Sequence, residues 1–379
     1  MALINSIKSL TLDLPPSCIA FSPLYPQLFV VGTYHLHGKE QQGDLSTENQ
    51  QHPETTTISS DDDDDNTSPE PAAPQKRTGS LILLHLGDDN TITLLSTTST
   101  DFAVLDIQWS GDVLAVATST GLLAFYRLDA CGSSDEHVKG ELELVCEKRV
   151  SGSSTLVLSL AWHPSRANVL GLTLSDGRVC LCTSASDIWS VDAVVKVSDV
   201  HAHSLEAWTL AFNDQQILSG GDDIQLLCTH IQEQEDPQPL WQDRKLHQAG
   251  ITAILPLSST LVITGSYDDH IRLLSLPSIG RKSCLAELNL GGGVWRLKAL
   301  QPNTSSSISP ITLLASCMHA GTRIVQLIRD ESEDIWRFEV LARFEEHRSM
   351  NYGSDVQPGQ RKRVVSTSFY DRLLCLWEV

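Results

Sequence analysis

Apolar and polar residues alternate along this chain in runs of strand length. The last run, from Ser366 to Trp377, has the pattern of a strand, a tight turn at Asp371 and a second strand that ends on the tryptophan. Six residues separate Asp371 from Trp377, and the module recurs earlier with other residues at its end, as from Asp268 to Leu274. The chain is therefore built from repeated pairs of strands.

The turn positions of these modules recur at a regular interval. They fall at residues 120, 176, 223, 268, 319 and 371, so their separations are 56, 47, 45, 51 and 52 residues. A period of about 40–45 residues, lengthened by loop insertions, is typical of a four-stranded propeller blade. One blade cannot bury its own apolar face, so the blades must close into a ring. The pattern predicts an all-β fold, a seven-bladed WD-repeat β-propeller.

The N-terminal segment predicts how the ring closes. Residues 4–14 alternate apolar and polar positions, as a half-buried strand does, and they precede the first blade. We expect this strand to join the C-terminal blade, which would remove the open seam of the ring. A length of 379 residues suits one such ring, so we expect a single domain over residues 1–379.

The alternation stops between about His37 and Arg77. This stretch is rich in Gln, Ser, Thr, Pro and Asp and includes five consecutive aspartates, Asp61 to Asp65. Such a composition cannot bury enough apolar area to fold, so we predict a disordered acidic insertion over residues 37–77. It replaces the tight turn between the second and third strands of blade 1, and the simplest interpretation is a tolerated surface insertion.

The negative net charge of the chain indicates which kinds of partner it can bind. The formal net charge is -20; Gly38 to Arg77 carries ten acids and three bases, a net of -7, which leaves -13 for the rest. This disfavours non-specific nucleic-acid binding, which needs a basic surface, and favours a basic partner. No apolar stretch approaches the roughly 18 residues that span a membrane, and the N-terminus lacks a signal pattern.

The cysteine pattern indicates a reducing compartment. Nine Cys are scattered without a CxxC pair, which suggests free thiols and no metal centre. We therefore expect a cytoplasmic protein without a metal or cofactor. The chain also lacks a GxSxG elbow, a P-loop, an HExxH motif and a GxGxxG motif after a strand. Residue patterns alone predict an acidic binding platform and name no reaction.

Histidines precede several of the turn aspartates by 20 to 24 residues. His203, His247 and His347 lie 20, 21 and 24 residues before the aspartates at 223, 268 and 371. A histidine that enters a blade and an aspartate in its turn can hydrogen-bond and hold the strands together, as WD-repeat blades do, so we do not interpret these pairs as catalytic dyads. His319 differs, because it occupies the turn position that aspartate holds elsewhere. One interpretation of His319 is a neutral sequence change in a surface turn. The other is an acid/base group, because an ordinary imidazole titrates near neutrality.

Aligning the first strands of the blades places aromatic residues at one mouth of the central channel. Trp208, Trp295 and Tyr352 hold the same position in blades 4, 6 and 7, and the next position inward includes Asp106 and Arg296. These aromatic rings either pack between blades or form a cage for a cationic group, which aromatic faces attract. The turn positions should lie on the same face of the ring.

Several segments together resemble a known family, the WD-repeat diphthine methyl esterases of the diphthamide pathway. The resemblance covers nearly the whole ordered chain and is most specific in blades 4 to 7. Its segments are Val31-Gly-Thr-Tyr34, Glu206-Ala-Trp208, Ser219-Gly-Gly-Asp-Asp223, Thr264-Gly-Ser-Tyr-Asp-Asp-His270, Gly292-Gly-Val-Trp-Arg296, Cys317-Met-His319, Tyr352-Gly-Ser-Asp355 and Ser368-Phe-Tyr-Asp371. The turn of blade 4 departs slightly, with Ile224 where glycine is expected.

The resemblance implies a hydrolase. The family is understood to hydrolyse the methyl ester of methylated diphthine, a modified histidine of translation elongation factor 2, to diphthine and methanol, ahead of the final amidation. Its partners would be that elongation factor and the amidation enzyme, and we expect a monomer that binds neither nucleic acid nor membrane. The alternative is a non-catalytic WD-repeat adaptor, which should present a broad apolar or charged face instead of convergent polar residues.

Site residues follow from that substrate as hypotheses. The trimethylammonium group of the modified histidine suits a cage of Trp208, Trp295 and Tyr352, with Glu206 or Asp355 nearby. Ester hydrolysis needs an activated water and a partner for the tetrahedral oxyanion. We assign the base to His319 or Asp355 and the oxyanion partner to Arg296. A covalent route through Ser354 is the alternative, although it lacks an elbow motif.

Overall fold

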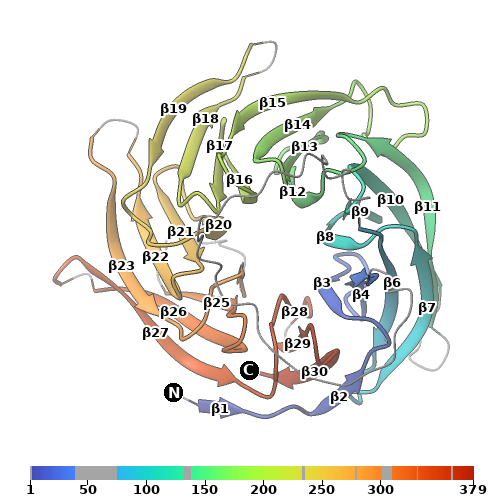
Figure 1. Cartoon of the computed structure of the whole chain (residues 1–379). Coiled ribbons are helices and arrows are strands. Elements are labelled where there is room, and N and C mark those ends of the chain that lie inside the picture. Colours follow the sequence, from blue (N-terminus) through green and yellow to red (C-terminus); the bar gives the residue numbers. More distant parts are fainter. Residues whose placement is uncertain are drawn as a thin grey trace, which may run out of the picture.

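The computed structural model describes residues 2–38, 75–131, 138–232, 235–277, 280–300, 310–330, 332–359 and 362–379. Seven sheets, antiparallel except for one added N-terminal strand, are arranged as a ring, each blade with its first strand innermost (Figure 1). The secondary structure of these residues consists of strands, without a helix. The chain is a seven-bladed WD-repeat β-propeller, as the repeat spacing predicts.

The first three blades follow one another along the chain. Blade 1 contains β3 (Pro16–Phe21), β4 (Leu28–Thr33), β6 (Arg77–Leu86) and β7 (Ile92–Thr100), and β5 (His35–Leu36) pairs with the start of β6. Blade 2 contains β8 (Val104–Ser110), β9 (Val113–Thr118), β10 (Leu122–Cys131) and β11 (Lys139–Arg149). Blade 3 contains β12 (Val157–His163), β13 (Arg166–Leu174), β14 (Arg178–Thr183) and β15 (Lys196–Ala202).

The remaining blades complete the circle. Blade 4 contains β16 (Ala207–Asn213), β17 (Gln216–Gly221), β18 (Leu226–His230) and β19 (Gln238–Asp243). Blade 5 contains β20 (Ile251–Pro256), β21 (Leu261–Ser266), β22 (His270–Ser275) and β23 (Ser283–Asn289). Blade 6 contains β24 (Arg296–Ala299), β25 (Ile311–Ser316), β26 (Thr322–Asp330) and β27 (Ile335–Phe344). Blade 7 contains β28 (Gly353–Val356), β29 (Arg363–Ser368) and β30 (Leu373–Glu378).

The N-terminal segment closes the ring. β2 (Lys8–Thr11) pairs antiparallel with β30 and supplies the outer strand of blade 7, which confirms the predicted closure. β1 (Ala2–Ile4), which the alternation did not separate from β2, pairs in parallel with β27 of blade 6. Residues 2–11 thus join two neighbouring blades across the seam.

The closing module of blade 7 shows why tryptophan ends it. Trp377 is fully buried and its ring stacks on Phe344 of blade 6 at 5.2 Å. Its indole Nε1 donates to the hydroxyl of Ser366 at 2.9 Å, and that hydroxyl also bonds with Nε2 of His347 at 2.8 Å. Burial of a large ring with its one donor satisfied stabilises the contact between the last two blades.

The predicted histidine–aspartate bond forms in one of the three blades. In blade 4, Nδ1 of His203 lies 2.8 Å from the carboxylate of Asp223. In the described parts of blades 5 and 7, the turn aspartate instead accepts the backbone N–H of the residue after the histidine, as Asp371 does from Arg348 at 3.1 Å. Turn aspartates therefore hold the loop between blades in place through both backbone and side-chain donors.

The insertion predicted over residues 37–77 lies largely outside the described residues, because residues 39–74 are not described. On either side of this gap β4 pairs with β6 and β5 extends the hairpin, so the gap falls between the second and third strands of blade 1. The third strand begins at Arg77, three residues earlier than the apolar run that starts at Ser80 suggests.

The turn of blade 4 contains a backbone strain that can be measured. Ile224 has a φ of +65°, whereas the residue directly after the turn position is a glycine with positive φ in blades 2 and 3. A β-branched residue in the left-handed region costs about 1–2 kcal/mol. We expect Ile224→Gly to raise the free energy of unfolding by on the order of 1 kcal/mol, after the entropic cost of the new glycine.

Denaturant unfolding of the two proteins measures this difference. The reverse change at the equivalent position, Gly177→Ile, is the matched control and should destabilise, because a Cβ there would lie 2.3 Å from the carbonyl oxygen of His203. A lower unfolding midpoint for Ile224→Gly would contradict the strain argument.

Candidate active site

A cavity of about 450 Å³ occupies the central channel. The first strands of all seven blades contribute to its wall, because these strands are innermost in the ring. Its polar lining residues include Asp106, Ser159, Arg296, Lys298, Ser354 and Asp355. Polar groups from blades 2, 3, 6 and 7 therefore converge on one cavity in the channel.

Two cations of blade 6 face this cavity. Arg296 and Lys298 are two residues apart on β24, so their side chains lie on the same face of the strand. A guanidinium Nη2 of Arg296 lies 3.8 Å from Asp106 of blade 2, and the ammonium of Lys298 forms an ion pair with Asp355 of blade 7. The charges of the channel wall are therefore paired across blades.

The two carboxylates are more firmly held than the two cations. Asp106 accepts hydrogen bonds from the hydroxyl of Ser159 at 2.9 Å and from the backbone N–H of Leu160 at 3.2 Å. Asp355 is only 3% exposed and accepts the backbone N–H of Phe21 at 2.8 Å as well as the ammonium of Lys298. Each carboxylate thus links its own first strand to that of the next blade, whereas Arg296 keeps donors available to a ligand.

Ser354 lies in a cluster of neutral polar groups. Its hydroxyl lies 3.0 Å from that of Ser316 and 3.2 Å from that of Thr322, and it donates to the amide oxygen of Asn351 at 3.1 Å. These partners include no imidazole or ammonium that could take the hydroxyl proton, which an activated serine requires. The hydrogen-bond partners of Ser354 therefore do not supply the base that an activated nucleophile needs.

Aromatic side chains form a continuous arc at the channel mouth. The rings of Trp208 and Trp295 are 5.7 Å apart, and those of Trp295 and Tyr352 are 5.1 Å apart, so the structure brings together the three predicted aromatic residues. Further rings extend the contact chain. This aromatic arc consists of Trp208, Tyr267, Trp295, Tyr352, Phe369 and Tyr34.

The sequence alignment missed three members of the aromatic arc. Tyr34, Tyr267 and Phe369 each follow directly on the second strand of a blade, after β4, β21 and β29. The alignment of first strands could not detect them. A second alignment on the ends of the second strands would have found all three, because these turns lie on the same face as the starts of the first strands.

Charged groups accompany two of the rings. The guanidinium of Arg296 lies over the ring of Trp295, with Cζ 5.0 Å from its centroid. Trp208 donates its indole N–H to the carboxylate of Asp222 at 3.1 Å. Glu206 is half-buried, and its backbone carbonyl accepts the N–H of Asp222 at 2.8 Å, so the two acids lie on adjacent loops of blade 4. One face of Trp295 therefore already carries a cation.

Burial raises the pKa of two tyrosines in the aromatic arc. Burial raises the pKa of Tyr267 far above its ordinary value, and the neighbouring Tyr352 and Asp222 raise it further. Burial likewise raises the pKa of Tyr352. Both phenols are therefore neutral at physiological pH.

His319 lies on the rim, outside the cavity. It is exposed in the turn between β25 and β26 and is not among the residues that line the channel. The preceding residue, Met318, accepts the backbone N–H of Asn351 at 3.0 Å, one position before Tyr352. The turn is therefore fixed beside the mouth, and the role of His319 as a base stays a prediction.

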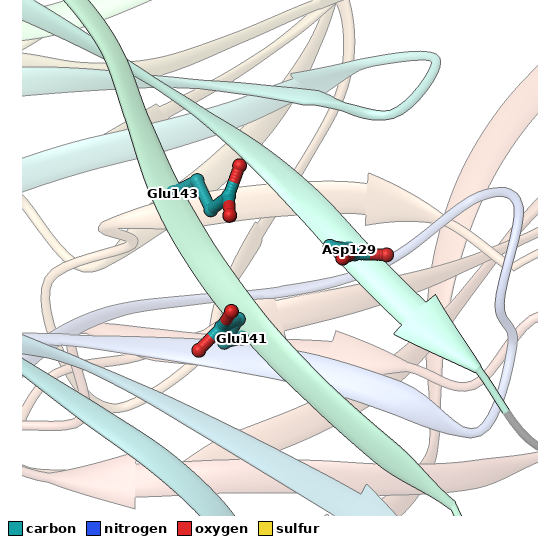
Figure 2. Close-up of side chains that lie close together, drawn as sticks. All are labelled: Asp129, Glu141 and Glu143. Atoms are coloured by element: carbon teal, nitrogen blue, oxygen red, sulfur yellow. The ribbon is translucent and has the colours of Figure 1, made fainter.

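One group of three carboxylates lies away from the channel, on the outer hairpin of blade 2. Figure 2 shows Asp129 of β10 beside Glu141 and Glu143 of β11, with ligand oxygens within 4.8 Å of one another. All three are exposed, and exposed acidic clusters are common in proteins without a metal. We assign no metal ion to this group.

Comparison with known proteins places the chain in a family. No family model matches it. It is 33% identical over 286 residues to a diphthine methyltransferase of Schizosaccharomyces pombe, covering 73% of this chain and 78% of that protein. It is 26% identical over 361 residues to a diphthine methyltransferase of Saccharomyces cerevisiae, covering 80% of this chain and 89% of that protein.

Similarity to solved structures concerns the fold. A chain of the crystal structure of the mitotic checkpoint complex superposes with a TM-score of 0.63 at 15% identity, covering 99% of this chain and 93% of that one. At this identity the similarity shows the propeller fold alone. The described residues contain no helix that is long and apolar enough to cross a membrane.

Fold and channel together define a WD-repeat propeller with a polar, aromatic-rimmed central site. The sequence relationship gives the particular class: the chain belongs to the diphthine methyltransferase family and acts in diphthamide biosynthesis.

Proposed function

We propose that this protein hydrolyses the methyl ester of methylated diphthine on translation elongation factor 2. Water adds to the ester carbonyl, the C–O bond to the methoxy group breaks, and the products are the carboxylate of diphthine, methanol and a proton. The reaction would take place in the cytoplasm and precede amidation of the carboxylate.

One observation carries the proposal: cationic, anionic and hydroxyl side chains from several blades converge on the channel cavity beside the aromatic arc. A non-catalytic adaptor needs a broad exposed surface and no such convergence. A modified histidine that bears a trimethylammonium group and an ester presents a cation to aromatic rings and a carbonyl to hydrogen-bond donors, and the channel mouth offers both.

The residues divide into roles by their geometry. Arg296 lines the cavity and has guanidinium donors that its long contact with Asp106 does not occupy, so we assign it to the developing oxyanion. Asp355 and His319 are the two candidates for the base that activates water. Asp355 lies in the cavity wall but already has three donors, whereas His319 is exposed at the rim and would act through water.

The test is a mass-spectrometric assay with the full chain and elongation factor 2 that carries methylated diphthine. We expect a loss of about 14 Da at the modified histidine together with release of methanol, since hydrolysis removes a methyl group and restores a proton. Binding without a mass change on verified substrate would contradict hydrolysis and favour the adaptor.

The name of the two yeast relatives specifies the opposite direction, transfer of a methyl group to diphthine. The same assay separates the two reactions, because transfer adds about 14 Da to unmethylated diphthine and depends on an added methyl donor, whereas hydrolysis depends on water alone. A gain of mass that requires the donor would overturn our proposal.

A further inference from the structure

The aromatic arc and its charged neighbours divide the channel mouth into two subsites. On blades 4 and 5, the rings of Trp208 and Tyr267 are 6.1 Å apart and nearly perpendicular, and the carboxylate of Asp222 is bonded to the indole N–H of Trp208. On blade 6, Arg296 lies over Trp295. Trp295 contacts both rings, so one side of this indole is rich in π-electrons and carboxylate, and the other side is cationic.

Two glycines fix Tyr267 in this position. A Cβ on Gly250 would lie 2.9 Å from one edge of the Tyr267 ring and 2.7 Å from the carboxylate oxygen of Asp222. A Cβ on Gly293 would lie 3.4 Å from the opposite ring edge and 2.8 Å from the sulfur of Met318. The Tyr267 ring and Asp222 therefore share a space that a side chain at residue 250 would disturb.

The carboxylate of Asp222 has capacity beyond the contact with Trp208. A carboxylate accepts about four hydrogen bonds or equivalent cation contacts. The hydrogen bond from the indole of Trp208 uses one oxygen of Asp222. A methylated ammonium group has no N–H to donate, so it is bound by aromatic faces and a nearby negative charge. Trp208, Tyr267 and Asp222 supply these two elements from adjoining blades.

We propose that Trp208, Tyr267 and Asp222 form a subsite for a quaternary ammonium group, and that Arg296 binds a carboxyl group of the same ligand across Trp295. The ligand class is a betaine, in which a methylated ammonium and a carboxyl group lie a few bonds apart. The inference rests on the proposed function, in which the ligand is the modified side chain of a protein. It also moves the cation away from Trp295, one face of which Arg296 occupies.

A binding experiment on the full chain tests the subsite without any turnover. The probes are glycine betaine and its neutral-headed isostere 3,3-dimethylbutanoate, which has the same shape and the same carboxylate but carbon in place of nitrogen. Saturation-transfer NMR on the methyl signal of each probe gives its Kd. We expect wild-type protein to bind betaine about tenfold more tightly than the isostere, as a desolvated cation–π contact implies.

Single substitutions test which residues cause the preference for betaine over the isostere. Asp222→Asn retains an oxygen for Trp208 but loses the charge, so the preference should fall to about twofold, and Tyr267→Leu should have a similar effect while Tyr267→Phe retains the preference. Arg296→Ala should weaken both probes alike, because both carry the carboxylate. The matched control is Asp192→Asn on an exposed loop of blade 3, where the preference should stay unchanged.

Two results would overturn the inference. Equal binding of betaine and isostere by wild-type protein would show that the site does not recognise the cation. A full preference in both Asp222→Asn and Tyr267→Leu, each with an unchanged melting temperature, would show that the cation binds elsewhere.

A second measurement tests whether the ligand is the modified side chain of the elongation factor. With methylated elongation factor 2 as substrate, Asp222→Asn should raise KM several-fold with little change in kcat, and an unchanged KM would refute a protein-borne ligand. Failure of the proposed function is distinguishable, because it would appear as absent turnover in wild-type protein that still prefers betaine.

Discussion

Replacing Arg296 with alanine is expected to lower kcat for methyl-ester hydrolysis by on the order of a hundredfold or more. The guanidinium lines the channel cavity on the short strand β24, where the ring of Trp295 supports it, and its contact with Asp106 is long at 3.8 Å. A fixed cation with available donors stabilises the charge that develops on the carbonyl oxygen. In the alanine variant, water would fill the space of the side chain and would have to reorient before it could stabilise that charge. Turnover of the modified elongation factor, followed by mass spectrometry, measures the effect.

The matched control is Arg127→Ala, which removes an exposed arginine paired with Asp112 on blade 2 and should leave turnover unchanged. Full activity of Arg296→Ala would refute its role. In the same assay, His319→Ala and Asp355→Asn distinguish the candidate bases, since only loss of the base should abolish the pH dependence of kcat on its acidic limb. If all three variants kept full turnover, the assigned site would be wrong.

Acidification from pH 7 to pH 5 is expected to destabilise the propeller by roughly 6 kcal/mol through three histidines whose pKa values are lowered in the folded state. Burial lowers the pKa of His201, His247 and His347 to about 4, well below the ordinary value of 6.5. The unfolded chain therefore binds more protons than the folded one between these pH values, and stability falls as pH falls through this window. Each histidine contributes about 2 kcal/mol of the loss at pH 5.

The environment of these histidines explains the shift. Each imidazole forms hydrogen bonds with hydroxyl groups, as His247 does with Thr264 at 2.8 Å and His201 with Ser219 at 2.6 Å. The charges that act on His247 are Arg272, which lowers its pKa further, and Asp268 and Asp243, which raise it. The turn aspartates have lowered pKa values and add their own loss of stability only at more acidic pH, below their ordinary value of 3.8.

Thermal unfolding across pH 4.5 to 7.5 measures this dependence. The variant His247→Gln cannot be protonated and should reduce the loss between pH 7 and pH 5 by about 2 kcal/mol. A melting temperature that is flat over this range in wild-type protein would contradict the assignment.

The repeat spacing by itself determined the fold. Four-stranded modules at intervals near 50 residues specify blades, and a strand ahead of the first blade specifies the closure that β2 provides. These inferences succeed because strand alternation and turn chemistry are local properties of the chain. The same alignment placed Trp208, Trp295 and Tyr352 at one mouth, since equivalent positions in equivalent strands must face the same way.

The tertiary structure alone decided which residues meet across blades. Asp355 reaches Lys298 and the backbone of Phe21, and Asp106 reaches Arg296, through contacts between strands that are distant in sequence. Tyr267 joins the aromatic arc from a turn that first-strand alignment does not sample. A repeat pattern fixes the direction of each side chain within its own blade, but the partner of that side chain depends on how neighbouring blades pack, which is a non-local property that the pattern does not encode.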